Sequence, residues 1–201
     1  MRLLIPFNSD YLRKRYHLSL NKIDMLISSV MPDLTERLAM DRRIISIDVF
    51  SNVDLTQNLC LSTKITQIQS DTDNLITGEE VILRYFELSE PRDDDVCVLY
   101  NPMFPFISIS KLENAYLSVK ENSVSSAAGS FSTSLRSSDE SLIRHSDHGI
   151  FSVFRESTFK KYNKRLVQPV DLHGLSAIES ICLRTQDDYE LFGLIKNSGL
   201  S

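Results

Sequence analysis

Apolar residues recur at helical spacing in the first fifth of the chain. They follow one another at intervals of three, four and three residues, which places them on one face of a helix. These residues are Leu20, Ile23, Ile27 and Val30. Pro32 ends this helix, and the acidic first turn of the next segment favours a second helix over 33–40. The pattern therefore predicts an N-terminal helical segment.

From residue 44 the apolar pattern alternates with a period of two, which is typical of β-strands. Alternation and β-branched content predict five strands, at 44–51, 59–69, 80–88, 96–100 and 106–110. The connections between them are short, whereas parallel strands need crossovers of about a dozen residues or more. The first half of the chain is therefore expected to form an antiparallel meander.

The second half is less regular. A capping box precedes a predicted helix over 111–120, and strands are expected at 149–154 and 165–170. Residues 180–195 fit either a hairpin or two short helices, and Gly193 favours the hairpin because glycine is costly inside a helix.

Residues 122–149 differ in composition from the rest of the chain. About one-third of them are serine, and few can anchor the stretch in a core. We expect a mobile loop or insertion there. The fold class predicted from the whole pattern is α+β. It consists of an antiparallel sheet with an N-terminal helical segment and flanking helices, in a single domain over 1–201 interrupted by the serine-rich loop.

Composition narrows the function classes. A formal net charge of −5 and a pI near 5.4 argue against coating nucleic acid through bulk charge. Only 6 glycines occur, which argues against the glycine-rich phosphate loops of many nucleotide-binding enzymes. Cys60, Cys97 and Cys182 stand far apart among apolar neighbours, as free thiols do in a reducing compartment. No apolar stretch approaches the ~20 residues of a membrane span. A cytoplasmic or nuclear location is expected.

One set of polar residues carries a resemblance to a known family. His17, a Pro-Asp pair at Asp33, then Asp48 and Lys64 are similar in order to the site of the cap-snatching endonucleases of segmented negative-strand RNA viruses. That resemblance implies a divalent-metal-dependent nuclease in which the two acids hold metal and the lysine assists the attacking group. The alternative is structural. Asp33 then lies at the start of a helix, where the helix dipole stabilises an acid, and Asp48 pairs with Lys64 across neighbouring strands.

Two basic clusters stand out against the acidic chain, and aromatic residues lie among them. They are Arg13, Lys14 and Arg15, and Lys160, Lys161, Lys164 and Arg165. Cations interleaved with aromatic rings can bind nucleic acid, an anionic membrane surface or an acidic protein partner. They also occur as solvated edges that keep strands from aggregating.

A proline-flanked apolar segment contains Met103, Phe104 and Phe106. Such residues form the centre of protein interfaces, and they pack equally well into a core. Together with the lack of a compact catalytic motif, this segment favours a non-catalytic protein–protein interaction or assembly subunit, a viral matrix-like protein being one example. The expected partner is another protein or a second copy of the chain.

No metal or cofactor is expected. The densest group of candidate metal ligands is His145, Asp147 and His148, which falls at the end of the serine-rich stretch without a fourth ligand nearby. A solvated loop is the preferred interpretation of that group.

Overall fold

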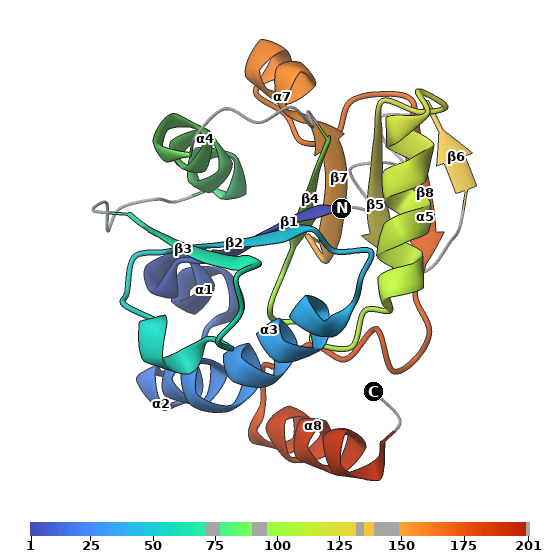
Figure 1. The fold of residues 1–201 in the computed structure, drawn as a ribbon. Helices are drawn as coiled ribbons and strands as arrows, with labels where there is room; N and C mark the ends of the chain where they lie inside the picture. The colour runs from blue at the N-terminus through green and yellow to red at the C-terminus, as the bar shows by residue number, and fades with distance from the viewer. Residues whose placement is uncertain (71–76, 90–95, 132–134, 139–148, 200–201) are drawn as a thin grey trace.

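A computed structural model describes residues 1–70, 77–89, 96–131, 135–138 and 149–199. Within this part of the chain, eight strands form one sheet in the order β3-β2-β1-β4-β7-β5-β8-β6 (Figure 1). The strands are β1 (Arg2–Phe7), β2 (Ser46–Ser51), β3 (Ile65–Gln69), β4 (Val96–Tyr100), β5 (Ser126–Ser130), β6 (Leu135–Ser137), β7 (Phe151–Arg155) and β8 (Val170–Gly174).

The sheet is mixed and mostly parallel. β1 runs parallel to both β2 and β4, β2 runs parallel to β3, and β5 runs parallel to β8. β7 is antiparallel to its neighbours β4 and β5, and β6 is antiparallel to β8. The molecule is therefore an α/β protein, and the predicted antiparallel meander of an α+β fold is wrong.

Helices cover both faces of this sheet. They are α1 (Ser9–Tyr16), α2 (Leu20–Met25), which continues as a π-helical turn (Leu26–Val30), α3 (Met31–Met40), a 3-10 turn (Thr56–Asn58), α4 (Gly78–Leu88), α5 (Ile109–Lys120), α7 (Glu156–Tyr162) and α8 (Gln186–Ser198). In Figure 1, α4 and α7 lie above the central strands, and α1, α2, α3 and α8 lie below them.

Two large apolar clusters fill most of the space between these layers, and a small third cluster lies at β5 and β8. Successive side chains of a strand point to opposite faces. Leu3 and Ile5 of β1 therefore join the larger cluster, which packs against α1, α3 and α5, and Leu4 joins the cluster that packs against α4 and α7. β1 is buried on both faces, as is usual for a central parallel strand. No element was predicted at residues 2–7, where the apolar run is continuous and carries no period.

The error in strand direction traces to one segment. Residues 80–88, predicted as a strand, belong to α4, which begins with a capping box between Thr77 and Glu80. Its buried residues Val81, Ile82, Tyr85 and Phe86 repeat at helical spacing. Because α4 connects β3 to β4, it supplies the crossover that lets strands on either side run parallel.

The tail was also assigned wrongly. Residues 186–198 form α8 in place of the favoured hairpin, and its start is fixed by a capping box between Thr185 and Asp188. Gly193 has open space around the position of a Cβ atom, so no packing constraint explains this glycine. Inside 122–149, the strand β5 is fully buried, so the expected loop does not extend over that whole range.

Other elements were predicted closely. The strands at 44–51 and 96–100 are confirmed as β2 and β4, and the helix at 111–120 is confirmed as the body of α5. Of the strand expected at 59–69, only Ile65–Gln69 forms. No strand forms at 106–110, where α5 begins, and β8 begins only at Val170, the last of the residues expected to form the strand at 165–170.

Candidate functional site

The sheet topology singles out the carboxyl ends of β1 and β4. These strands are parallel neighbours, and the chain continues from β1 toward β2 on one side and from β4 toward β5 on the other. In open α/β sheets, ligands bind in the crevice at such a switch point. A pocket of about 570 Å³, its open mouth included, lies there, between α1 and α4.

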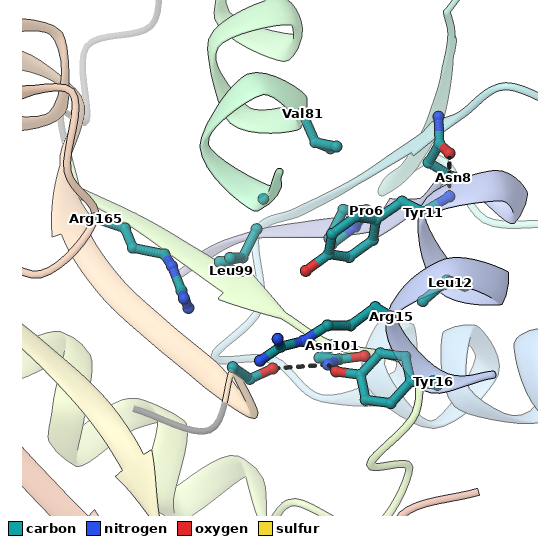
Figure 2. A pocket seen from close by; sticks show the side chains of 12 residues that line it. Pro6, Asn8, Tyr11, Leu12, Arg15, Tyr16, Val81, Leu99, Asn101 and Arg165 are labelled. Carbon is teal, nitrogen blue, oxygen red and sulfur yellow. Dashed lines mark hydrogen bonds between the residues drawn. The ribbon is translucent and has the colours of Figure 1, made fainter. Parts of the chain in front are cut away.

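Apolar side chains form the walls of this pocket. Pro6 and Leu99 come from the ends of β1 and β4, Leu12 comes from α1, and Val81 comes from α4. The ring of Tyr11 closes the side next to α1 (Figure 2). Such walls accept a flat apolar group, for example a nucleobase.

Two arginines bring positive charge to the pocket. Figure 2 shows the guanidinium groups of Arg15, from α1, and Arg165, from the segment after α7, extending toward the same space. Arg165 is anchored, because its Nε donates to Glu79 Oε1 at 3.1 Å and its Nη1 donates to Ser152 Oγ at 3.2 Å. Arg15 is exposed, and it forms no ion pair with any residue that the structure describes. Its guanidinium is therefore available to an anionic ligand.

Asn101 joins three segments at the floor of the pocket. Its Nδ2 donates to Tyr16 Oη at 2.6 Å and to the Gly149 carbonyl at 2.7 Å, while its Oδ1 accepts from the Met103 N–H at 3.0 Å. Burial raises the pKa of the Tyr16 phenol to about 12, so the hydroxyl stays protonated at neutral pH.

The turn from β1 into α1 is held by Asn8. Its Oδ1 caps the helix by accepting from the Tyr11 N–H at 2.8 Å. Asn8 Nδ2 is buried and has no hydrogen-bond partner in the described part of the chain. A side chain, not a run of glycines, therefore shapes the turn that follows the first strand.

The structure does not bring the nuclease-like residues together. Asp48 is fully buried on the α4 face, where it accepts from Tyr85 Oη at 2.5 Å and from Arg2 Nε at 3.3 Å. Asp33 lies on α3, across the sheet, and pairs with Lys196 at 2.6 Å.

The other two residues of that set are also separate. His17 is the exposed left-handed residue that ends α1, and Lys64 donates to the Asp41 carbonyl at 2.8 Å. Lys64 therefore does not pair with Asp48, and the cross-strand pair offered as the structural alternative does not form either.

The basic clusters divide in the folded chain. Arg15 and Arg165, one from each cluster, line the same pocket. The remaining members are exposed on α1 and around α7: Arg13, Lys14, Lys160, Lys161 and Lys164. Among these, Arg13 lies 3.8 Å from Asp10, and Lys160 lies 2.6 Å from Glu156.

The apolar segment is part of the core. Met103 is 0%, Phe104 1% and Phe106 7% exposed. The Phe106 ring packs against the Phe192 ring of α8 in a tilted arrangement, with the centroids 5.5 Å apart. The interface hypothesis needed these side chains at a surface, and the structure places them inside the chain's own core.

The pocket's donors do not suit a resident metal ion. No group of three or more His, Cys, Asp or Glu side chains with suitable geometry occurs among the described residues. The side chains that line the pocket offer amides, phenols and guanidinium groups, and hard divalent cations prefer carboxylates. His145, Asp147 and His148 lie outside the described residues.

Asn101 was not singled out from the sequence as a site residue, and Tyr16 was only one of the aromatic residues that lie among the basic clusters. Asn101 directly follows β4. In a parallel sheet, a polar residue just after a buried strand lies at the carboxyl edge, where ligands bind, so its position would have marked it as a site residue. The strands of the predicted antiparallel sheet do not share a carboxyl edge, so the position of Asn101 did not indicate a site.

Within the described residues, no helix is long and apolar enough to cross a membrane.

Comparisons with solved structures agree on the fold. No protein-family model and no curated protein sequence matches the chain. Among solved structures, a 4-diphosphocytidyl-2C-methyl-D-erythritol synthase from Anaerococcus prevotii superimposes with a TM-score of 0.58 at 12% identity, over 98% of this chain and 95% of that one. A 2-C-methyl-D-erythritol 4-phosphate cytidylyltransferase from Francisella tularensis gives 0.60 at 12% identity, over 96% and 98%.

A nucleotidyl transferase from Methanothermobacter thermautotrophicus gives a TM-score of 0.55 at 12% identity, over 95% of this chain and 94% of that one. All three similar structures are nucleotidyltransferases, and this overturns the expectation of a non-catalytic, matrix-like assembly subunit. At this identity the likeness shows that the chain has a nucleotidyltransferase-like fold.

Proposed function

We propose that this protein is a nucleotidyltransferase that binds a nucleoside triphosphate in the pocket at the ends of β1 and β4. The observation that carries the proposal is the meeting of Arg15 and Arg165 beside an apolar slot at the switch point of the sheet. The fold shared with cytidylyltransferases supports the same conclusion.

The two halves of the pocket match the two halves of a nucleotide. Pro6, Leu99 and Val81 offer flat apolar contact to a base, while Arg15 and Arg165 offer several N–H donors to phosphate oxygens. Arginine suits this role because its guanidinium binds phosphate in a bidentate manner. The scarcity of glycine does not oppose this function, since side-chain cations can take the place of backbone N–H groups in binding phosphate.

The proposed reaction is the attack of an acceptor oxygen on the α-phosphorus, with pyrophosphate as the leaving group. Negative charge grows on the phosphoryl oxygens during this step, and fixed cations lower its energy. Arg165 is held in place by Glu79 and Ser152, so it is oriented before the nucleotide binds. A divalent cation enters, in this proposal, as part of the metal–nucleotide substrate.

The proposal is tested by equilibrium binding of CTP, UTP, ATP and GTP, and by release of pyrophosphate in the presence of sugar phosphates and polyol phosphates. At least one nucleotide is expected to bind, and the double variant Arg15→Gln/Arg165→Gln is expected to weaken its binding about a hundredfold.

A matched control removes the same charge from the same two clusters. Arg13→Gln/Lys161→Gln changes two exposed cations that do not line the pocket, and it should leave the dissociation constant nearly unchanged. Equal losses in the two double variants would show that bulk charge, and not this pocket, attracts the nucleotide.

A further inference from the structure

The orientation of the Asn101 side-chain amide is fixed by its backbone neighbours. The Met103 N–H can only donate, and it lies 3.0 Å from Oδ1, while the Gly149 carbonyl can only accept, and it lies 2.7 Å from Nδ2. A flipped amide would lose both hydrogen bonds. The assignment of oxygen and nitrogen therefore follows from chemistry.

This orientation decides the role of the Tyr16 hydroxyl. The remaining N–H of Asn101 Nδ2 donates to Tyr16 Oη at 2.6 Å, so the tyrosine oxygen accepts there. Its own proton must point elsewhere, and no acceptor for it occurs among the described residues. Tyr16 is 8% exposed and lines the pocket, where Figure 2 shows it beside Arg15.

We infer that Asn101 holds the Tyr16 hydroxyl as a hydrogen-bond donor to an oxygen acceptor of the bound nucleotide. The inference rests on the proposed function. Arg15, beside Tyr16, has only donors as well. The ligand group at this corner of the pocket is therefore an acceptor without N–H or O–H groups, namely a carbonyl oxygen of a base or an oxygen of the phosphate chain.

Tyr16→Phe is the first arm of the test, because it removes the hydroxyl and keeps the buried ring. Binding of CTP, cytidine and tripolyphosphate is measured by calorimetry. Affinity for CTP should fall about tenfold, as for the loss of one hydrogen bond to a polar or charged acceptor. If the affinity for cytidine falls as well, the base carbonyl is the acceptor. If the affinity for tripolyphosphate falls as well, the acceptor is an oxygen of the phosphate chain.

Asn101→Asp is the second arm, because it reverses the hydrogen bond with nearly no change of shape. The carboxylate would accept the Tyr16 proton and turn a lone pair of the hydroxyl toward the ligand. Affinity for CTP should fall by at least as large a factor as in Tyr16→Phe.

The double variant separates this role from a merely structural one. In the Tyr16→Phe background no hydroxyl remains to be reversed, so Asn101→Asp should reduce affinity by a smaller factor than it does in the wild type. Tyr189→Phe is the matched control, since its hydroxyl donates to the Lys22 carbonyl on α2, away from the pocket. It should leave the affinity unchanged.

The outcomes are distinguishable. If the wild-type chain binds CTP but Tyr16→Phe binds it equally well, the inference is wrong and the proposed function stands. If the factors of the two single variants simply multiply in the double variant, Asn101 does not act through Tyr16 and the inference is also wrong. If the wild-type chain binds neither CTP nor any other nucleoside triphosphate, both the inference and the proposed function fall.

Discussion

Arginine and tyrosine side chains occur together at both ends of β1, and their surroundings differ. At the amino end, Arg2 is 4% exposed and contacts both Asp48 and Tyr85, neither of which is exposed to solvent. Glu156 adds a second carboxylate 3.9 Å from the Arg2 guanidinium. Burial raises the pKa of Tyr85 well above its ordinary range. Arg2, Asp48 and Glu156 therefore each have an opposite charge beside them.

At the carboxyl end, Arg15 is exposed without an ion pair among the described residues, and Tyr16 has an unused hydroxyl proton there. The same residue types therefore serve two purposes. Where the donors meet acceptors of the chain, they stabilise the fold. Where donors line a concave surface without acceptors, they suit a ligand. This difference can be measured first as stability and then as affinity.

The largest effect is expected from Asp48→Ala. The substitution leaves the Arg2 charge buried without its main partner, so the free energy of unfolding should fall by about 3–5 kcal/mol. Urea denaturation measures the loss. Asp33→Ala is the control, because Asp33 forms a half-exposed pair with Lys196 and should cost at most about 1 kcal/mol. Similar losses in both variants would contradict the assignment of Asp48 to the buried cluster.

A somewhat smaller effect is expected from pH, at Glu179. This carboxylate is 6% exposed and accepts hydrogen bonds from Lys111 Nζ and from Ser108. Burial acts to raise its pKa, but the hydrogen bonds from Lys111, Ser176 and Ser108 outweigh it and lower the pKa from 4.5 to about 2. The folded-state pKa is depressed, so the stabilisation is present above pH 4.5 and is lost as the pH falls from there toward 2.

The expected loss is up to about 3 kcal/mol over that window, at about 1.4 kcal/mol for each pKa unit. Urea denaturation of the wild type and of Glu179→Gln between pH 6 and pH 3 measures the part of this loss that falls above pH 3, about 2 kcal/mol. The wild type should lose more stability than the variant on acidification. Parallel curves would show that Glu179 has the same pKa in the folded and unfolded chain.

The sequence allowed parts of this fold to be predicted, and the reason lies in periodicity. β2 and β4 alternate clearly, and α5 has a capping signal, so each was found close to its true bounds. In α4, Val81, Ile82, Tyr85 and Phe86 are β-branched or aromatic, and they suggested a strand although their spacing is helical. The strand preference of these residue types was given more weight than their helical spacing. Without the crossover helix, the strands were predicted to be antiparallel.

The candidate site was only half accessible from the sequence. The charge of Arg15 and Arg165 stood out in an acidic chain, so both were named as binding residues. That they share one pocket depends on contacts between distant segments. Asn101 contacts Tyr16 across 85 positions and Gly149 across 48, and pattern analysis of one sequence cannot find such pairs.

Arg165→Gln should have a mixed effect, because Arg165 both lines the pocket and contacts the chain. Its ion pair with Glu79 is partly exposed, so its loss should lower the free energy of unfolding by about 1 kcal/mol. Nucleotide affinity should fall about tenfold. Glu79→Gln is the informative companion. It should lower the free energy of unfolding by a similar amount but leave the Arg165 charge in place. Nucleotide affinity should therefore fall less in Glu79→Gln than in Arg165→Gln. An equal loss of affinity would show that Arg165 acts only when Glu79 holds it.

The smallest effect on stability is expected from Arg15→Gln, and it gives the strongest contrast with the amino end of β1. Arg15 is exposed and has no ion pair among the described residues, so the free energy of unfolding should change by less than about 0.5 kcal/mol. Affinity for the nucleotide should nevertheless fall about tenfold, and its dependence on salt should become weaker, since a phosphate contact is screened by ions. Urea denaturation and calorimetry at two salt concentrations on the same preparation measure both quantities. A variant that is destabilised by more than about 1 kcal/mol, with unchanged affinity, would mean that Arg15 belongs with Arg2 as a structural arginine.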